Sequence, residues 1–224
     1  MSSYYSFFTS PFGGNWCGEE IDILLNPTLR CLLRKIVAIE NADYDYLITL
    51  FSGHGKEADD GTVLVINGQG EKIMMNALTN LSQRQLLIMD CCRSRSLLPV
   101  DTAFVEEGTT MLSLSRDPIR QAYEERIGDS LPQEVILYAC DEGEPAFDSD
   151  EGGEYLRHLL NAAQMVSTPS CSPFVSVGQA HYKAVSMMRE DDPTMIQHPQ
   201  ILQPRCAAER QLPLAVDGKF CERN

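Results

Sequence analysis

Tyr46-Leu-Ile-Thr-Leu-Phe51 is a short apolar run that is followed by Ser52-Gly-His-Gly55. Arg84-Gln-Leu-Leu-Ile-Met-Asp-Cys-Cys92 is a second apolar run, and it ends in chemically reactive side chains. Apolar runs of this length are typical of buried parallel strands. In open sheets of parallel strands, ligands bind beyond the carboxyl ends of the strands. The two stretches therefore predict neighbouring strands that deliver His54 and Cys92 to the same edge of a sheet.

Strands and helices alternate outward from these two runs. Further strands are predicted over 20–25, 62–66, 71–75, 134–139 and 212–216, and helices over 28–42, 118–127, 155–165 and 177–188. The turn Asn67-Gly-Gln-Gly70 joins two of the short strands and predicts a hairpin between the His54 and Cys92 strands. Past Asp191 the chain is rich in proline and is predicted to be mostly irregular. The alternation is typical of an α/β fold with a mainly parallel sheet and helices on both faces.

Length and charge narrow the class of protein. A chain of 224 residues is long enough for one α/β domain with a buried core. Its net charge of −14 repels phosphate backbones, so we expect no nucleic-acid partner. No apolar run approaches the roughly 20 residues of a membrane helix, and the N-terminus does not resemble a secretory signal. We therefore expect a protein with no membrane partner.

The cysteines and histidines indicate a reducing compartment and no structural metal. The eight cysteines lack the spacing of a small disulfide scaffold, and none of them forms a CxxC pair. The four histidines are far apart in the sequence, which gives little support to a zinc site. We expect a cytoplasmic protein that binds no metal through these residues.

His54 and Cys92 together suit nucleophilic catalysis. Gly53 and Gly55 flank the histidine and allow the backbone to approach a substrate closely. An imidazole can act as general base near neutral pH, and a thiol is a nucleophile in its thiolate form. Either residue alone is more simply a turn histidine or a core cysteine. At one sheet edge they fill both roles of a nucleophile–base pair.

Strand alternation distinguishes the two adjacent cysteines. Side chains alternate along a strand, so Asp90 and Cys92 share one direction while Cys91 points the other way into packing. A carboxylate next to a thiol raises the thiol pKa, which makes Asp90 a poor activator. The Asp90 carboxylate is better suited to the floor of a pocket that pairs with a basic substrate side chain.

These segments resemble a known group of peptidases. Ser52-Gly-His-Gly55 and Asp90-Cys-Cys-Arg-Ser94 are similar to the two catalytic motifs of the caspase, metacaspase and orthocaspase clan. Glu144-Pro-Ala146 and Gln197-His-Pro-Gln200 resemble later segments of bacterial caspase-family proteins. The resemblance implies one caspase-like peptidase domain over 1–224. Its expected fold is a three-layer sandwich, with a small hairpin between the His and Cys strands.

The resemblance also implies roles for individual residues. His54 would be the base and Cys92 the nucleophile of a cysteine endopeptidase that works through a thioester. The backbone N–H groups of Gly55 and Cys92 would form the oxyanion hole. Asp90 would lie in the pocket for an Arg or Lys at P1, the residue before the cleaved bond. Asp141 either adds to that pocket or is a solvated loop acid.

The sequence departs from the family at its start. Family members usually open with a strand and a helix, whereas only about seven residues precede the segment Phe8–Gly14 that resembles the family. The chain is then a fragment, or a regulatory partner supplies the missing element, or 1–18 is reorganised. The alternative function is therefore a catalytically silent interaction module completed by a partner chain.

Cofactor and biological setting follow less directly. The resemblance implies that no cofactor is required. Some metacaspases depend on calcium, and the acidic run 148–151 offers oxygen ligands, although an acidic surface loop explains the same residues. Bacterial relatives act in stress or defence pathways, which is the setting that the resemblance implies.

Overall fold

A six-stranded mixed sheet forms the centre of the computed structural model, which describes residues 3–95, 117–149, 152–166, 168 and 172–221. The strand order is β3-β2-β1-β4-β5-β9. The strands are β1 (Leu47–Ala58), β2 (Gly61–Val65), β3 (Lys72–Met74), β4 (Arg84–Cys91), β5 (Gln133–Tyr138) and β9 (Gln200–Leu202). The central strands β1, β4 and β5 are parallel, and the outer strands are antiparallel to their neighbours.

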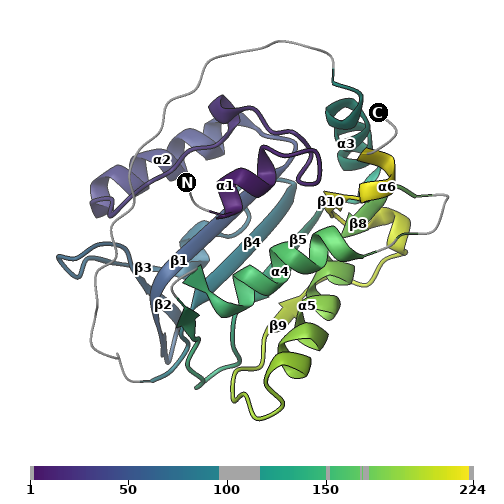
Figure 1. Cartoon of the computed structure of the whole chain (residues 1–224). Coiled ribbons are helices and arrows are strands. Elements are labelled where there is room, and N and C mark those ends of the chain that lie inside the picture. The colour runs from purple at the N-terminus through teal and green to yellow at the C-terminus, as the bar shows by residue number, and fades with distance from the viewer. Residues whose placement is uncertain (1–2, 96–116, 150–151, 167, 169–171, 222–224) are drawn as a thin grey trace.

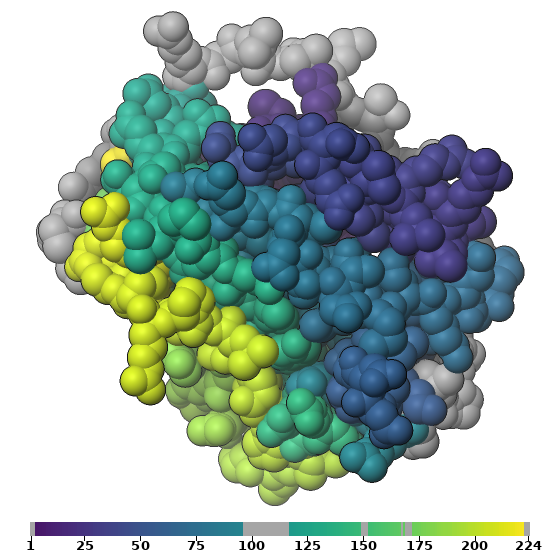
Figure 2. All heavy atoms as spheres, turned by 180° about the vertical axis from the view of Figure 1, so that it is seen from behind, coloured from purple at the N-terminus to yellow at the C-terminus, as the bar shows by residue number. Residues whose placement is uncertain are grey.

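Helices cover both faces of this sheet, which gives three layers (Figure 1). The helices are α1 (Ser3–Phe8), α2 (Leu29–Ala42), α3 (Pro118–Asp129), α4 (Glu154–Met165), α5 (Val177–Asp191) and α6 (Gly218–Cys221). The buried side chains of α1, α3, α4 and α5 share one core with Leu86 and Ile88 of β4. Ile36 of α2 packs on the opposite face with Leu87 and Met89. From behind, α2 forms a band across this face above the strands (Figure 2). The three-layer α/β fold predicted from the sequence is confirmed.

Shorter elements complete the chain. The short strands are β6 (Asp148–Ser149), β7 (Gly152–Gly153), β8 (Phe174–Ser176) and β10 (Pro213–Val216), and the 3-10 helices are η1 (Gly18–Glu20), η2 (Met75–Leu78) and η3 (Ala208–Arg210). β6 pairs with β7, and β8 pairs with β10, outside the central sheet. None of the helices in the described ranges is long and apolar enough to cross a membrane.

The strand predicted over 20–25 is wrong. η1 ends at Glu20, and the chain then follows an irregular path that belongs to no sheet, in which Ile23, Leu24 and Leu25 are each more than 40% exposed. An alternating apolar pattern forms a strand only where a neighbouring strand offers hydrogen-bond partners. Across the described residues, the edge of β1 opposite β4 has no such partner over Leu47–Ser52.

The prediction for the chain past Asp191 is corrected in part. The last strand was predicted and is present as β10, but β9 also lies in this region and pairs with β5, with Leu202 opposite Ile136. A strand of three residues next to prolines is too short to show a period of two. The segment predicted to be irregular therefore supplies one edge of the central sheet.

The predicted hairpin is present as β2 and β3, but its relation to β1 differs from the prediction. β1 does not end before His54; it continues to Ala58. It pairs with β4 up to Gly53 and then with β2 from His54 onward. His54 therefore lies inside a strand, at the position where β1 changes its partner.

Candidate active site

The register of β1 and β4 brings the predicted catalytic residues to one place. Gly53 lies opposite Cys91, so His54 and Cys92 each follow this last parallel pair by one residue. No hydrogen bond joins the His54 ring to the Cys92 sulfur in the part of the chain that the structure describes. Catalytic hydrogen bonds are often long before substrate binds. The positions suit a nucleophile–base pair, and the catalytic roles stay predictions.

Gly55 lies where only glycine fits. A Cβ atom on Gly55 would come within 2.4 Å of the Cys92 carbonyl oxygen and 2.6 Å of the Cys91 sulfur. The backbone of β1 therefore runs directly against the backbone of the candidate nucleophile. The two residues predicted to form the oxyanion hole are therefore neighbours, and their role in holding an oxyanion stays a prediction.

Burial separates Cys92 from the other two cysteines near this edge. Cys91 is 2% exposed and packs on the α2 face, as strand alternation predicted. Burial raises the pKa of the Cys91 thiol far above its ordinary value, and it raises the pKa of Cys140 to about 12. Cys92 is only half-buried. Of the three thiols, that of Cys92 is the least buried.

Asp90 lies below Cys92 on the face that α4 covers. Its carboxylate is 5% exposed, and this burial raises the pKa of Asp90 to about 7. The Ser52 hydroxyl donates a hydrogen bond to Oδ2 at 3.1 Å, which lowers this pKa, while the charge of Asp148 raises it. A buried acid with a nearby acid is a good partner for a cation, because a cation favours the ionised carboxylate.

Asp141 was the second acid predicted for the P1 pocket, but in the structure it does not lie beside Asp90. Asp141 is exposed and lines a separate cavity of about 450 Å³ with Arg189 and Asp192. Asp148 acts electrostatically on Asp90 instead, because β6 pairs it with Gly153, which lies against the Asp90 carboxylate. Sequence reasoning treated Asp148 only as part of an acidic loop, so its position next to Asp90 was missed.

Arg93, the residue after Cys92, points away from the nucleophile. Its guanidinium donates to the Glu57 carboxylate at 3.2 Å and to Glu142 at 3.1 Å. It also stacks on the Tyr138 ring, 4.2 Å from the ring centroid. Arg93 is buried, so this network holds the end of β4 to β1 and to the loop after β5.

The loop after β5 contacts Cys92 directly. The backbone N–H of Ala146 donates to the Cys92 sulfur at 3.2 Å, and the thiol donates to the Ala146 carbonyl oxygen at 3.4 Å. The backbone N–H of the next residue, Phe147, donates a hydrogen bond to the side-chain oxygen of Gln197. The sequence offered a signal for both, since Glu144–Ala146 and Gln197–Gln200 are segments that resemble the family.

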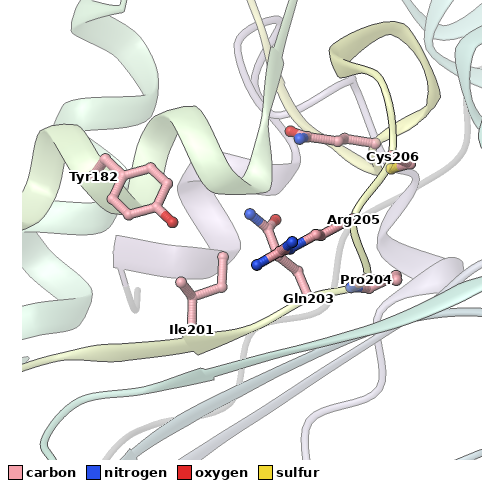
Figure 3. A pocket seen from close by; sticks show the side chains of 7 residues that line it. Tyr182, Ile201, Gln203, Pro204, Arg205 and Cys206 are labelled. Atoms are coloured by element: carbon pink, nitrogen blue, oxygen red, sulfur yellow. The ribbon is translucent and has the colours of Figure 1, made fainter.

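A second hollow lies away from these residues. Side chains of α5, β9 and the following segment surround about 350 Å³ (Figure 3). Its lining residues are Tyr182, Ile201, Gln203, Pro204, Arg205, Cys206 and Gln211. None of the residues predicted for the site lines it, so it does not extend the candidate active site.

Metal ligands do not gather in the described ranges. No group of three or more His, Cys, Asp and Glu side chains lies in a metal-binding arrangement among those residues. The acidic run 148–151, suggested above for calcium, lies partly outside the described residues. Asp148, the acidic residue of this run that the structure describes, acts on Asp90.

Comparison with known proteins gives one family. A family model described as the caspase domain matches residues 12–209. The crystal structure of caspase-1 from Spodoptera frugiperda is similar at a TM-score of 0.48 and 10% sequence identity, over 81% of this chain and 69% of that chain. No curated protein matches the sequence.

Proposed function

This chain belongs to the caspase domain family, and from that premise we propose that it is a cysteine endopeptidase that cleaves proteins after Arg or Lys. The observation that carries the proposal is the register of β1 and β4, which delivers His54 and the half-buried thiol of Cys92 to the same edge. The family supports a cysteine peptidase acting on protein. The dyad and the basic P1 preference rest on these residues.

The reaction follows from the two side chains. His54 takes the proton of Cys92, and the thiolate attacks the carbonyl carbon of the cleaved bond. The N–H groups of Gly55 and Cys92 hold the negative oxygen that develops. The protonated imidazole then gives its proton to the leaving amine, which leaves a thioester on Cys92. Water, activated by His54, hydrolyses the thioester and frees the thiol.

The preference for a basic P1 residue rests on Asp90 and Asp148. A guanidinium or ammonium next to Asp90 favours the carboxylate form and lowers a pKa that burial has raised to about 7. Asp148 adds a second negative charge near the same point. An acidic P1 side chain would meet like charge there, and a neutral one would leave the buried acid unpaired.

A mass-mapped digest tests this function. Peptides with Arg, Lys, Asp or Leu at P1 are incubated with wild type, Cys92→Ala and His54→Ala. We expect wild type to cut only after Arg and Lys, and both variants to lose activity by roughly 10³-fold or more. Cys91→Ala is the matched control and keeps its activity. Full activity in Cys92→Ala, or cleavage after Asp, contradicts the proposal.

A second candidate function is a silent interaction module completed by a partner. The observation in its favour is the edge of β1, which over Leu47–Ser52 has no paired strand among the described residues. Such an edge can accept a strand from another protein. A peptide electrophile with Arg at P1 separates the two functions. An adduct on Cys92 supports the peptidase, and no adduct on a folded protein supports the module.

We extend the proposal to the setting of the enzyme. We propose a metacaspase-like cytoplasmic protease of bacterial stress or defence, active without a cofactor. Activity on an Arg peptide should then be the same after treatment with a chelator and after addition of calcium. A loss with chelator that calcium restores would replace this part of the proposal with calcium dependence.

A further inference from the structure

The backbone of Ala146 contacts the sulfur of Cys92 through two hydrogen bonds. Its N–H and its carbonyl oxygen lie 3.2 and 3.4 Å from Sγ. A carbonyl carbon under attack must come to roughly 3–3.5 Å from the nucleophile. Two atoms of the protein's own chain already lie at that distance. A peptide segment must move before a substrate carbonyl can take their place.

Gly153 covers the second functional group, the Asp90 carboxylate. A Cβ atom on Gly153 would lie 2.1 Å from Oδ2 and 2.3 Å from Oδ1, so the glycine backbone touches both oxygens. The carboxylate is 5% exposed. A Lys or Arg side chain has no path to Asp90 while Gly153 stays in this position. The nucleophile and the P1 acid are therefore covered by the same loop region.

Gln197 fixes the Ala146 end of this region. Its side-chain carbonyl accepts a hydrogen bond from the Phe147 N–H at 3.1 Å, and its amide donates to the Ala139 carbonyl at 2.7 Å. Gln197 is 4% exposed, so water competes little for these bonds. The residue that follows Ala146 is thus tied to the end of the central sheet.

His198 and Glu144 fix the other side. The Glu144 carboxylate binds the His198 ring at 2.7 Å and the His198 backbone N–H at 2.9 Å. The Glu144 carbonyl also accepts from the backbone N–H of Arg93 at 3.1 Å. The His198 side chain is 51% exposed, so it can be changed with little effect on the core.

We propose that Glu144–Phe147 and Gly153 form an autoinhibitory cover over Cys92 and Asp90, held closed by a clamp of Gln197 and His198. This inference rests on the proposed function, because a cover is autoinhibitory only if Cys92 is the nucleophile of a peptidase. The clamp consists of the buried Gln197 amide and the half-exposed His198 ring, and it is held by a few hydrogen bonds, each of modest net strength. An extended basic peptide opens it by supplying its own backbone to Cys92 and a cation to Asp90.

The test measures access to the thiol, which needs no turnover. The rate of carbamidomethylation of Cys92 by iodoacetamide is followed by mass spectrometry in the full chain. His198→Leu removes the ring donor, and Gln197→Met removes both side-chain bonds at similar volume. We expect each variant to speed the reaction roughly 5- to 10-fold, because His198→Leu removes the hydrogen bond of the ring and Gln197→Met removes the two side-chain hydrogen bonds. His198→Asn keeps a donor near the Nδ1 position and should react within about twofold of wild type.

The outcomes separate this proposal from the proposed function. Faster alkylation in His198→Leu and Gln197→Met, with no peptidase activity in the wild type or in either variant, supports the cover and contradicts the peptidase. Unchanged or slower alkylation overturns the cover. Unchanged alkylation with lost peptidase activity makes Glu144–Phe147 a substrate platform instead. If Gln197→Met fails to fold, the exposed His198→Leu and His198→Asn pair decides alone.

Discussion

Two neighbouring parallel strands, β4 and β5, end in the same kinds of residue with opposite results. β4 ends in Asp90, Cys91 and Cys92, and β5 is followed by Cys140 and Asp141. At the end of β4 the acid is buried and the last cysteine is half-buried. After β5 the cysteine is 0% exposed and the acid is exposed. Composition at a strand end therefore does not decide which side chain enters the cleft.

Register and order along the chain explain the difference. Continuing the pairing of Met89 with Tyr138 places Asp90 beside Ala139, and Cys91 beside Cys140. Side chains alternate between the faces, so both of these cysteines leave the cleft face. Asp90 comes before its cysteines and is covered by α4, whereas Asp141 comes after its cysteine and reaches solvent. A shift of one residue thus separates a candidate specificity acid from a surface acid.

The largest expected effect compares the cysteines at the two strand ends. Cys92→Ala should lower kcat/KM for an Arg peptide by roughly 10³-fold or more, because the nucleophile is lost. Cys140→Ala should keep kcat/KM within about threefold, since its buried thiol stays protonated. Steady-state kinetics on both variants measures this. Equal losses in the two variants would mean that Cys140 takes part in the reaction.

The next effect concerns stability and pH at the buried acid. The unfolded chain loses the Asp90 proton near 3.8, whereas the folded protein keeps it until about 7. The folded state binds more protons between these values, so the free energy of unfolding falls as pH rises from 4 to 7. The fall is on the order of 4 kcal/mol for this group. Urea titrations at several pH values should show it, and Asp90→Asn should remove it.

Asp141→Asn is the matched control for that experiment. Asp141 is exposed at the end of the neighbouring strand, so its variant should keep the fall in stability between pH 4 and 7. A pH dependence that disappears in Asp141→Asn and persists in Asp90→Asn would reverse the assignment of the buried acid.

The sequence predicts the β4 end well because its information is local. The apolar run Leu86–Met89 identifies a buried strand, and alternation then separates Cys91 from its neighbours without any long-range contact. The loop after β5 depends on residues far along the chain. Ala146 contacts Cys92 from a loop that Gln197 ties to Ala139 after β5, and no period in the sequence reports a bond across 50 residues. Asp148 was missed for the same reason.

The failure at 20–25 has a related cause. An alternating pattern there satisfied the local criterion for a strand, but a strand also needs a partner edge. The open edge of β1 lies along Leu47–Ser52, and the segment does not pair with it. The local pattern shows that a segment such as 20–25 favours a strand, and the rest of the chain determines whether a neighbouring strand is available to pair with it.

A third comparison sets the two acids against each other in catalysis. Asp90→Asn should lower kcat/KM for an Arg peptide by roughly 10²-fold, because a desolvated charge pair with the P1 cation is lost. Asp141→Asn should change it by less than about threefold. A panel of peptides with Arg, Lys and Leu at P1 measures both. Equal effects of the two variants would return Asp141 to the P1 pocket.

The smallest effect tests how Asp90 is tuned. The Ser52 hydroxyl donates to the Asp90 carboxylate at 3.1 Å and stabilises its ionised form. Ser52→Ala should raise the pKa of Asp90, which moves the acid limb of kcat/KM for Arg peptides to higher pH. At pH 7 we expect a loss of roughly 3- to 10-fold, mostly in KM, from one hydrogen bond to a charged group. Ser52→Thr keeps the hydroxyl and should restore the profile. A loss confined to kcat would place Ser52 with Cys92 and His54 instead of Asp90.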